Sequence, residues 1–292
     1  VSSAATASWP PPPRVGSGSM EDGGACPAPF GVHLEWRLTL KARLPQAAQL
    51  SAQRGCCPGC KERLTATLFN NPRYCHFVGC YFCPRCHAGD LRVIPARVAE
   101  RWDFEPRKVC KMAAEFLDAQ VNLPLVPITR VRRTKVSSQS ALTEMHALRQ
   151  KLMRILQVLS ESSCEFHETL TAILSAQLPA YMLHGVDLYT MQDLIRLAIE
   201  SRSYPPFGRL ARLATMGAEH IRVCATCQSG ARFCAICASP RPVYIFEIGA
   251  YRACDCCQAV FHSKCFARAG SECPVCLRPR ANVRRPSLAP VR

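Results

Sequence analysis

The sequence predicts a zinc-stabilised α+β fold in which two Cys/His-rich clusters clasp a helical middle segment. Two observations lead to this prediction. Twenty of the 292 residues are Cys, and most stand in pairs with the spacing of metal ligands, gathered in two groups along the chain. Between the two groups, apolar residues recur every three or four positions, which is the period of an α-helix with one buried face.

The composition excludes several classes of protein. Apolar residues make up 48% of the chain, which is enough to bury a core. No apolar run approaches the roughly 18 residues of a membrane-spanning helix, and no basic start followed by an apolar stretch resembles a signal peptide. Secreted disulfide scaffolds are disfavoured because they usually have fewer than about 80 residues. We therefore expect a cytoplasmic metal-binding protein.

The chain divides by composition into a main domain with an extension at each end. Residues 1–29 are rich in Ser, Ala, Pro and Gly, and we expect a disordered low-complexity appendage there. Residues 281–292 form a basic tail. Within the main domain, 30–280, we expect three parts: an N-terminal zinc cluster over 45–110, a helical segment over 111–220 and a C-terminal zinc cluster over 221–280.

One strand is predicted before the first zinc cluster. Apolar and polar residues alternate there with a period of two, which is typical of a half-buried strand. The apolar positions are Val32, Leu34, Trp36, Leu38 and Leu40.

The helical segment begins with one long predicted helix. Its apolar stripe consists of Leu142, Met145, Leu148, Leu152, Ile155 and Leu159. A second helix should follow Ser162 and Glu165, which have the spacing of a capping box, and Pro179 should end it.

Two more helices follow in the same segment. Thr190 and Asp193 repeat the capping spacing at the start of the third helix, and Tyr204-Pro205-Pro206 should end it. A fourth helix is expected from Leu210 to His220. Packing of these stripes against one another is favoured over a role in gripping a partner helix.

The C-terminal cluster consists of pairs in which two residues separate the ligands. This spacing forms a tight knuckle that aims both side chains at one ion, and tetrahedral zinc needs two such knuckles. The predicted ligands here are Cys224, Cys227, Cys234, Cys237, Cys254, Cys257, His262, Cys265, Cys273 and Cys276.

The N-terminal cluster has two knuckles with further candidates beside them. The predicted ligands are Cys57, Cys60, Cys75, Cys83, Cys86 and His87, with Cys56, His76 and Cys80 as competitors. Sixteen ligands make about four zinc ions. Because neither ten nor six is divisible by four, the count predicts at least one site shared between the two clusters.

The remaining Cys residues have no good pairing and are expected to be ordinary thiols: Cys26, Cys56, Cys80, Cys110, Cys164 and Cys256. Catalytic zinc usually keeps an open position among His and carboxylate ligands. The predicted ligands are nearly all Cys, so we expect closed sites with structural ions.

The chain has a formal net charge of +16, which four bound zinc ions and fourteen thiolates would lower to about +10. The basic residues concentrate in two places, at Arg130, Arg132, Arg133 and Lys135 and at Arg278, Arg280, Arg284 and Arg285. An anionic membrane surface, an acidic protein and nucleic acid all fit such segments, and so does a plain solvated loop and tail.

The order and spacing of the motifs over residues 45–280 resemble the Rubicon-homology domain. This family includes Rubicon, Pacer, the pleckstrin-homology family M proteins and the differentially-expressed-in-FDCP proteins. The resemblance rests on Tyr74-Cys75, Tyr81 to His87, Ile94 to Val98, Trp102-Asp103-Phe104, Phe233-Cys234, Phe261 to Phe266 and Glu272-Cys273-Pro274, together with the remaining C-terminal knuckles.

The resemblance implies a zinc-stabilised, non-enzymatic adaptor that binds a GTP-loaded late-endosomal Rab GTPase. It also implies roles in endosome maturation, lysosome positioning and autophagosome fusion, with peripheral attachment to late endosomes and lysosomes. The family's zinc ligands match the sixteen predicted residues.

Two alternatives remain open at this point. RING-type ubiquitin ligases also use interleaved Cys and His pairs, but His262-x-x-Cys265 is not followed by a Cys at position 268. A zinc-finger module that binds anionic lipid is the second alternative, although the basic His-rich string of FYVE domains is absent. Nucleic acid is not expected, because the knuckle spacing does not fit a finger with a reading helix.

Overall fold

A computed structural model describes residues 34–64, 71–132, 137–237, 239–270 and 272–277. The chain divides into two compact units. Unit 1 comprises 1–142 and 187–201, and unit 2 comprises 143–186 and 202–292. The predicted appendage, the basic tail, Val32, Arg133 and Lys135 lie outside the described residues. So does Cys26.

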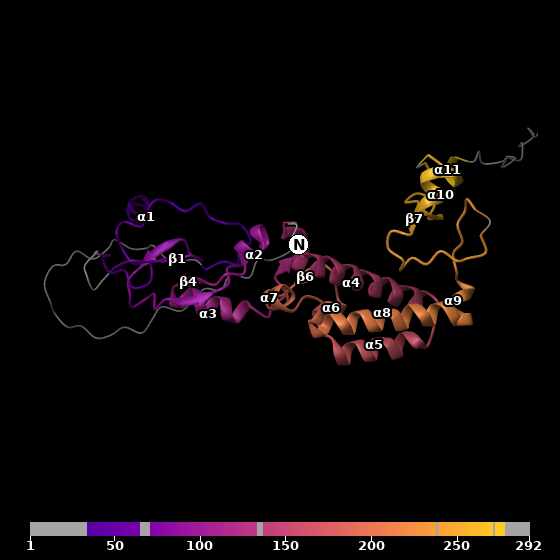
Figure 1. Ribbon diagram of the computed structural model, residues 1–292, viewed down its shortest axis with the longest axis horizontal. Helices are drawn as coiled ribbons and strands as arrows, with labels where there is room; N and C mark the ends of the chain where they lie inside the picture. The colour runs from indigo at the N-terminus through magenta and orange to yellow at the C-terminus, as the bar shows by residue number, and fades with distance from the viewer. Residues whose placement is uncertain (1–33, 65–70, 133–136, 238, 271, 278–292) are drawn as a thin grey trace, which may run out of the picture. The chain divides into compact units, whose positions relative to one another are not determined.

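Unit 1 is built from short strands with helices packed against them (Figure 1). Three antiparallel pairs of strands are present: β1 (Arg73–Cys75) with β2 (Cys80–Phe82), β3 (Asp90–Arg92) with β4 (Arg107–Val109), and β5 (Val126–Pro127) with β6 (Leu188–Tyr189). The helices are α1 (Gln46–Ala52), α2 (Pro95–Arg101), α3 (Lys111–Gln120), α7 (Met191–Glu200) and the 3-10 helix η1 (Ile128–Arg130). A second 3-10 helix, η2 (Ser201–Ser203), lies at the boundary between the units.

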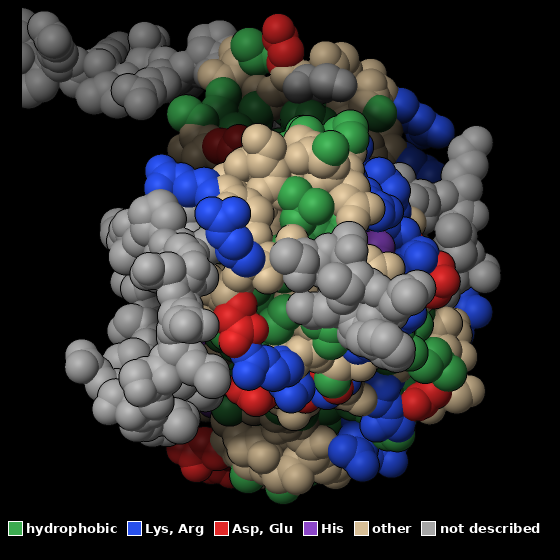
Figure 2. Space-filling view, turned by 90° about the vertical axis from the view of Figure 1, so that its left-hand side faces the viewer, with side chains coloured by type: hydrophobic (Ala, Val, Ile, Leu, Met, Phe, Trp, Pro, Cys, Tyr) green, Lys and Arg blue, Asp and Glu red, His purple; other side chains and the backbone are tan. Residues whose placement is uncertain are grey.

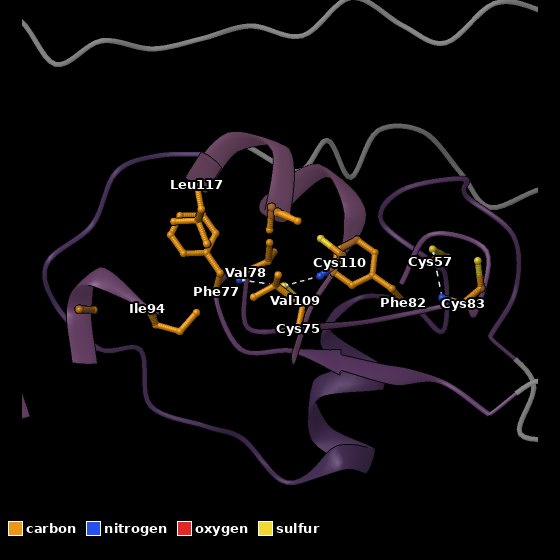
Figure 3. Close-up of a cluster of buried hydrophobic side chains, with 13 residues drawn as sticks. Cys57, Cys75, Phe77, Val78, Phe82, Cys83, Ile94, Val109, Cys110 and Leu117 are labelled. Carbon is orange, nitrogen blue, oxygen red and sulfur yellow. Dashed lines mark hydrogen bonds between the residues drawn. The ribbon is translucent and has the colours of Figure 1, made fainter. Parts of the chain in front are cut away.

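The core of unit 1 lies between α3 and the first two strand pairs. Ala113, Ala114 and Leu117 form the buried face of α3. They pack with Phe77 and Val109, among other side chains (Figure 3). Small alanine side chains let the helix approach the strands closely, because little volume separates the two backbones.

The predicted strand before the first cluster does not form. Over 34–45 the described chain pairs with no other strand, although Leu34, Trp36 and Leu40 pack against the core of unit 1. The backbone N–H of Leu40 donates to Oε1 of Glu100 at 2.9 Å. The apolar positions are therefore half-buried against the core, as predicted, while the hydrogen bonds of a sheet are missing.

Unit 2 begins with a group of three long helices. They are α4 (Ser137–Glu161, whose first residues belong to unit 1), α5 (Phe166–Gln177) and α8 (Pro205–Val223), with the short α6 (Ala180–Leu183) after α5. They run side by side (Figure 1). Leu142, Met145, Leu152, Ile155 and Leu159 are all buried, which confirms the predicted stripe of α4; Leu148 is half-buried.

The helix ends agree only in part with the predictions. Thr190 and Asp193 form the expected capping box at the start of α7, and α5 ends two residues before Pro179. Ser162 and Glu165 do not form a capping box, because the Ser162 hydroxyl donates to the carbonyl of Val158 instead.

Pro205 has a different role from the one predicted. The third helix, α7, already ends at Glu200, and Pro205 occupies the first turn of α8. Proline suits that turn because its missing N–H has no intrahelical partner there.

The end of unit 2 is a small Cys-rich region. It contains α9 (Ala225–Ser229), the antiparallel pair β7 (Tyr251–Ala253) and β8 (Val260–His262), α10 (Ser263–Arg268) and α11 (Pro274–Leu277). Its apolar core is small and centres on Val243, Val260 and Phe261. A region with so little apolar burial needs additional cross-links to be stable.

The described helices include none that is both long and apolar enough to cross a bilayer. Figure 2 shows one face of the molecule, on which Lys and Arg side chains are interspersed with Asp and Glu. Among the described residues, Arg92 and Asp118 form an ion pair at 2.6 Å.

Candidate metal centres

The described residues contain four groups of Cys and His whose ligand atoms all lie within 4.8 Å of one another. Each group has four members. We name them cluster 1 (Cys57, Cys60, Cys83, Cys86), cluster 2 (Cys164, His220, Cys224, Cys227), cluster 3 (Cys234, Cys237, His262, Cys265) and cluster 4 (Cys254, Cys257, Cys273, Cys276).

Cluster 1 lies in unit 1 and joins two C-x-x-C knuckles. Cys57 and Cys83 are almost fully buried, and Figure 3 shows their side chains next to each other. The backbone N–H of Cys83 donates to the sulfur of Cys57 at 3.4 Å, and the sulfurs of Cys60 and Cys83 are 3.5 Å apart. A Cβ atom at Gly59 would lie 2.8 Å from the sulfur of Cys86, so this knuckle needs glycine.

Cluster 2 joins the helices of unit 2. Cys164 lies between α4 and α5, and His220 lies one turn before the end of α8. The sulfur of Cys164 is 3.3 Å from Nε2 of His220 and 3.9 Å from the sulfur of Cys224. The ring of Phe166 stacks on the His220 imidazole at a centroid distance of 4.1 Å and fixes its orientation.

Clusters 3 and 4 are interleaved along the chain. The first and third ligand pairs of this region form cluster 3, and the second and fourth pairs form cluster 4. The loop of each cluster therefore carries ligands of the other, which is a cross-brace. Nδ1 of His262 faces the sulfur of Cys237 at 3.3 Å and that of Cys265 at 3.8 Å.

Cluster 4 is the most exposed of the four clusters. Cys257 and Cys276 are exposed, whereas Cys254 and Cys273 are half-buried. The sulfurs of Cys254 and Cys276 are 3.7 Å apart, and those of Cys257 and Cys273 are 3.6 Å apart.

All four clusters fit tetrahedral zinc. Zinc–sulfur bonds of about 2.3 Å in a tetrahedron place two sulfurs about 3.8 Å apart, and the sulfur–sulfur distances given above are 3.5 to 3.9 Å. The donor sets are four Cys in clusters 1 and 4, and three Cys with one His in clusters 2 and 3. Both sets are typical of structural zinc sites, in which no coordination position is left for substrate.

In each cluster, a knuckle lowers the pKa of its first thiol. A backbone N–H two or three residues further along donates to the first sulfur of the knuckle, which favours its charged form. Such bonds from Cys257 and Cys256 lower the pKa of Cys254 to about 6. Burial raises the pKa of Cys234, but N–H donors at Cys237 and His262 outweigh it and lower that pKa to about 6.

The pKa of a neighbouring thiol in the same cluster is raised. Burial and the nearby sulfur of Cys83 raise the pKa of Cys60 to about 11. Burial and the sulfurs of Cys237 and Cys234 raise the pKa of Cys265 to about 11. A divalent cation between the sulfurs would remove this repulsion, so the clusters need one to hold all their thiolates charged.

The structure brings fourteen of the sixteen predicted ligands into clusters and leaves two outside. Cys75 is fully buried in the core of unit 1, where its sulfur accepts the backbone N–H groups of Cys110 at 3.3 Å and Val78 at 3.4 Å (Figure 3). His87 is also fully buried, with Nε2 3.2 Å from the carbonyl oxygen of Tyr74.

The three competitors of the N-terminal cluster, Cys56, His76 and Cys80, belong to none of the four clusters either. Cys56 is disulfide-bonded, so the expectation of an ordinary thiol there is wrong. His76 makes an edge contact with the Tyr74 ring at 5.2 Å. Cys80 accepts the side-chain amide of Gln49 at 3.6 Å.

Sequence reasoning missed Cys164 and His220, the two residues that complete cluster 2. Cys164 stands alone in the sequence, and no spacing rule connects it to a residue 56 positions away. His220 carried a usable signal, since it lies only four residues before Cys224, in the last turn of the helix that leads into that knuckle.

The new count also changes the argument for a shared site. The clusters contain four ligands in the N-terminal region and twelve in unit 2. Both numbers are divisible by four, so the count no longer requires a site built from both regions.

Comparison with known proteins places these clusters in a family. Residues 73–281 match the model of the Rubicon Homology Domain. The chain belongs to the Rubicon-homology-domain family. All the ligands of clusters 2, 3 and 4 fall within the matched residues, and cluster 1 has its second knuckle there.

Curated proteins of the Rubicon homology family align with most of this chain. Pleckstrin homology domain-containing family M member 3 of Homo sapiens is 30% identical over 241 residues, which is 82% of this chain and 31% of that protein. Differentially expressed in FDCP 8 homolog of Drosophila melanogaster is 30% identical over 209 residues, 71% of this chain and 41% of that protein. Protein associated with UVRAG as autophagy enhancer of Bos taurus is 28% identical over 233 residues, 80% of this chain and 34% of that protein. The chain thus spans well under half the length of these relatives.

Proposed function

We propose that this chain is a non-enzymatic, zinc-stabilised adaptor that recognises the GTP-loaded form of a late-endosomal Rab GTPase. In this proposal it acts in endosome, lysosome and autophagy traffic from the cytoplasmic face of late endosomes and lysosomes. The Rubicon homology domain supports it, and one relative is named as an enhancer of autophagy that associates with UVRAG.

The observation that carries the non-enzymatic role is the closure of all four clusters. Each has four Cys or His ligands within 4.8 Å and includes no carboxylate. A zinc ion held by four such ligands has no position for substrate or activated water. In this role zinc supplies cross-links, and the chain's own surface supplies recognition.

Zinc is well placed for this structural role. Cluster 2 ties the α4–α5 connection to the end of α8, and clusters 3 and 4 cross-brace a region whose apolar core is small. Metal binding in such regions contributes directly to the free energy of folding. Loss of a ligand should therefore abolish partner binding indirectly, through unfolding.

A capture experiment tests the proposal. The purified, zinc-loaded chain is immobilised and offered late-endosomal Rab proteins carrying a GTP analogue or GDP. We expect capture of the GTP form to exceed capture of the GDP form at least tenfold. Equal capture of both forms, or capture of neither, would overturn the proposal.

Matched variants show whether a cluster supports this binding. His262→Leu and Cys265→Ser each remove a ligand of cluster 3, so both should lose metal and Rab capture together. Cys256→Ser changes an exposed Cys between two ligands of cluster 4 without belonging to any cluster, and it should keep both. A variant of His262 or Cys265 that kept its metal and fold but lost capture would show that these residues contact the partner directly.

The cross-brace of clusters 3 and 4 favours one second candidate, a RING-like ubiquitin ligase. This arrangement is shared with RING domains, although position 268 is Arg where their central motif has a Cys. Discharge of ubiquitin from a charged conjugating enzyme distinguishes the two functions. The adaptor proposal predicts no stimulation of discharge by the zinc-loaded chain.

A further inference from the structure

The knuckle of cluster 3 exposes apolar side chains on a rigid support. Phe233 and Ile236 flank Cys234 and are 51% and 39% exposed. The knuckle cannot fold these side chains inward, because the N–H of His262 donates to the sulfur of Cys234 at 3.4 Å. The N–H of Ala235 also donates to the carbonyl of Val260 at 3.1 Å. Two large apolar groups are thus held in water on one knuckle, and gathered apolar side chains of this kind favour a protein or membrane contact.

The chain around this knuckle carries cations and no carboxylates. Residues 220–246 contain three Arg and no Asp or Glu. Arg222 is already engaged, with Glu247 at 2.6 Å and the ring of Phe246 beneath its guanidinium. Arg232 and Arg241 are exposed, and within the described part of the chain neither forms an ion pair.

The helix that completes cluster 3 adds to the positive charge. Helix α10 supplies Cys265 and carries Lys264 and Arg268, both exposed, with no carboxylate. Like Arg232 and Arg241, they lie within four residues of a cluster ligand, so they are within about 15 Å of its centre. Three thiolates and one zinc ion give cluster 3 a charge of −1. Together with these four cations, the tip around cluster 3 has a net charge of about +3.

Three carboxylates stand in the neighbouring segments, at Glu247, Asp255 and Glu272. Glu247 pairs with Arg222. Asp255 and Glu272 are next to ligands of cluster 4, where Asp255 follows Cys254.

We propose that the tip formed by Phe233 and Ile236 inserts into the interfacial region of an anionic bilayer. Arg232, Arg241 and Lys264 then face the lipid phosphates. Apolar side chains in a segment that carries cations and no carboxylate suit such a membrane, because insertion and electrostatic attraction act together. This contact needs no GTPase and uses other residues than the basic stretch at Arg130 and the C-terminal tail.

Vesicle binding by the full zinc-loaded chain tests this inference. Sedimentation with phosphatidylcholine vesicles is compared with sedimentation with vesicles containing one fifth phosphatidylserine. Since each cation near an anionic surface is worth about fivefold in partitioning, we expect at least tenfold stronger binding to the anionic vesicles. No binding to them, or equal binding to both compositions, would overturn the inference.

Three variants locate the contact. Phe233→Ser with Ile236→Ser, and Arg232→Gln with Arg241→Gln, should each lower partitioning at least tenfold at unchanged metal content. Ile199→Ser, which changes an apolar residue of α7 that is 77% exposed, should stay within twofold of the parent chain. Equal partitioning of the parent and the two double variants would overturn the inference.

Insertion itself has a spectroscopic signature. Phe233→Trp should show a blue-shifted emission on addition of anionic vesicles, with quenching by brominated lipid, beyond any change in the parent chain. Unchanged emission at saturating vesicles would argue against insertion.

The same variants separate this inference from the proposed function. If the Phe233→Ser, Ile236→Ser variant keeps vesicle binding but loses GTP-dependent Rab capture, the tip is a protein contact and the membrane inference is wrong. If the parent chain captures no Rab yet binds anionic vesicles through the tip, the membrane inference stands without the GTPase.

Discussion

The sulfur of Cys164 lies 3.3 Å from Nε2 of His220, although 56 residues separate the two in the chain. This contact joins the turn between α4 and α5 to the last turn of α8. Cys224 and Cys227 complete the group directly after that helix. A metal ion at cluster 2 would therefore lock the three long helices of unit 2 at one end.

Replacing Cys164 should remove one of the four metal ions. Cys164→Ser leaves cluster 2 with three ligands, and we expect elemental analysis to show one ion fewer than in the parent chain. Thermal unfolding should reveal a loss of stability on the order of 3–5 kcal/mol, because the metal contributes to folding. Cys256→Ser, an exposed Cys outside the clusters, serves as the control and should keep four ions. Retention of all four by Cys164→Ser would contradict the assignment.

Replacing Cys83 and replacing Cys75 should affect the metal content differently. Cys83→Ser removes a ligand of cluster 1, whereas Cys75→Ser changes a sulfur that accepts hydrogen bonds from Val78 and Cys110. We expect the first variant to lose one metal ion and the second to keep all four, both measured on folded protein. A loss of metal from Cys75→Ser would restore the ligand set predicted from sequence.

Two glycines of α8 make a matched pair for packing. A Cβ atom at Gly217 would lie 2.6 Å from Cγ2 of Ile155 and 3.1 Å from Cδ2 of Leu170, whereas Gly208 has open space around it. Gly217→Ala should therefore destabilise the protein by about 1–3 kcal/mol through overpacking. Gly208→Ala should stabilise it by up to about 1 kcal/mol, since Ala favours a helix. Chemical denaturation measures both, and equal effects would show that α8 does not approach α4 closely.

The thiol of Cys75 should make stability depend on pH. Burial raises its pKa, but hydrogen bonds from Cys110 and Val78 outweigh burial and lower the pKa to about 7, from 9.0. A lowered pKa in the folded state stabilises the fold above pH 9, and this stabilisation is lost as the pH falls through about 7.

We therefore expect the free energy of unfolding to exceed that of Cys75→Ser by an amount that grows between pH 7 and pH 9. The increase should be up to about 2 kcal/mol. Chemical denaturation at fixed zinc concentration across this range provides the measurement. A difference between the two proteins that stays constant with pH would show that the thiol does not ionise in the fold.

Local sequence patterns predicted the structure correctly where the interaction itself is local. The capping box of Thr190 and Asp193 forms as predicted, because both partners lie within one helical turn. Ser162 and Glu165 have the same spacing, yet Ser162 bonds back to Val158 in α4. The preceding helix continues far enough to offer that carbonyl, and spacing alone does not reveal where it ends.

The sequence by itself determined the Cys and His knuckles, the buried stripe of α4 and the family, because each depends on residues a few positions apart or on their order. Only the tertiary structure decided which knuckles share a cluster and that Cys164 and His220 complete cluster 2. Tetrahedral coordination requires four ligands around one point. A knuckle fixes two of them locally, and the other two come from wherever the fold brings a suitable side chain. In cluster 2, the packing of α4, α5 and α8 brings Cys164 to His220. These two residues are 56 positions apart, so no local pattern in the sequence predicts that they meet.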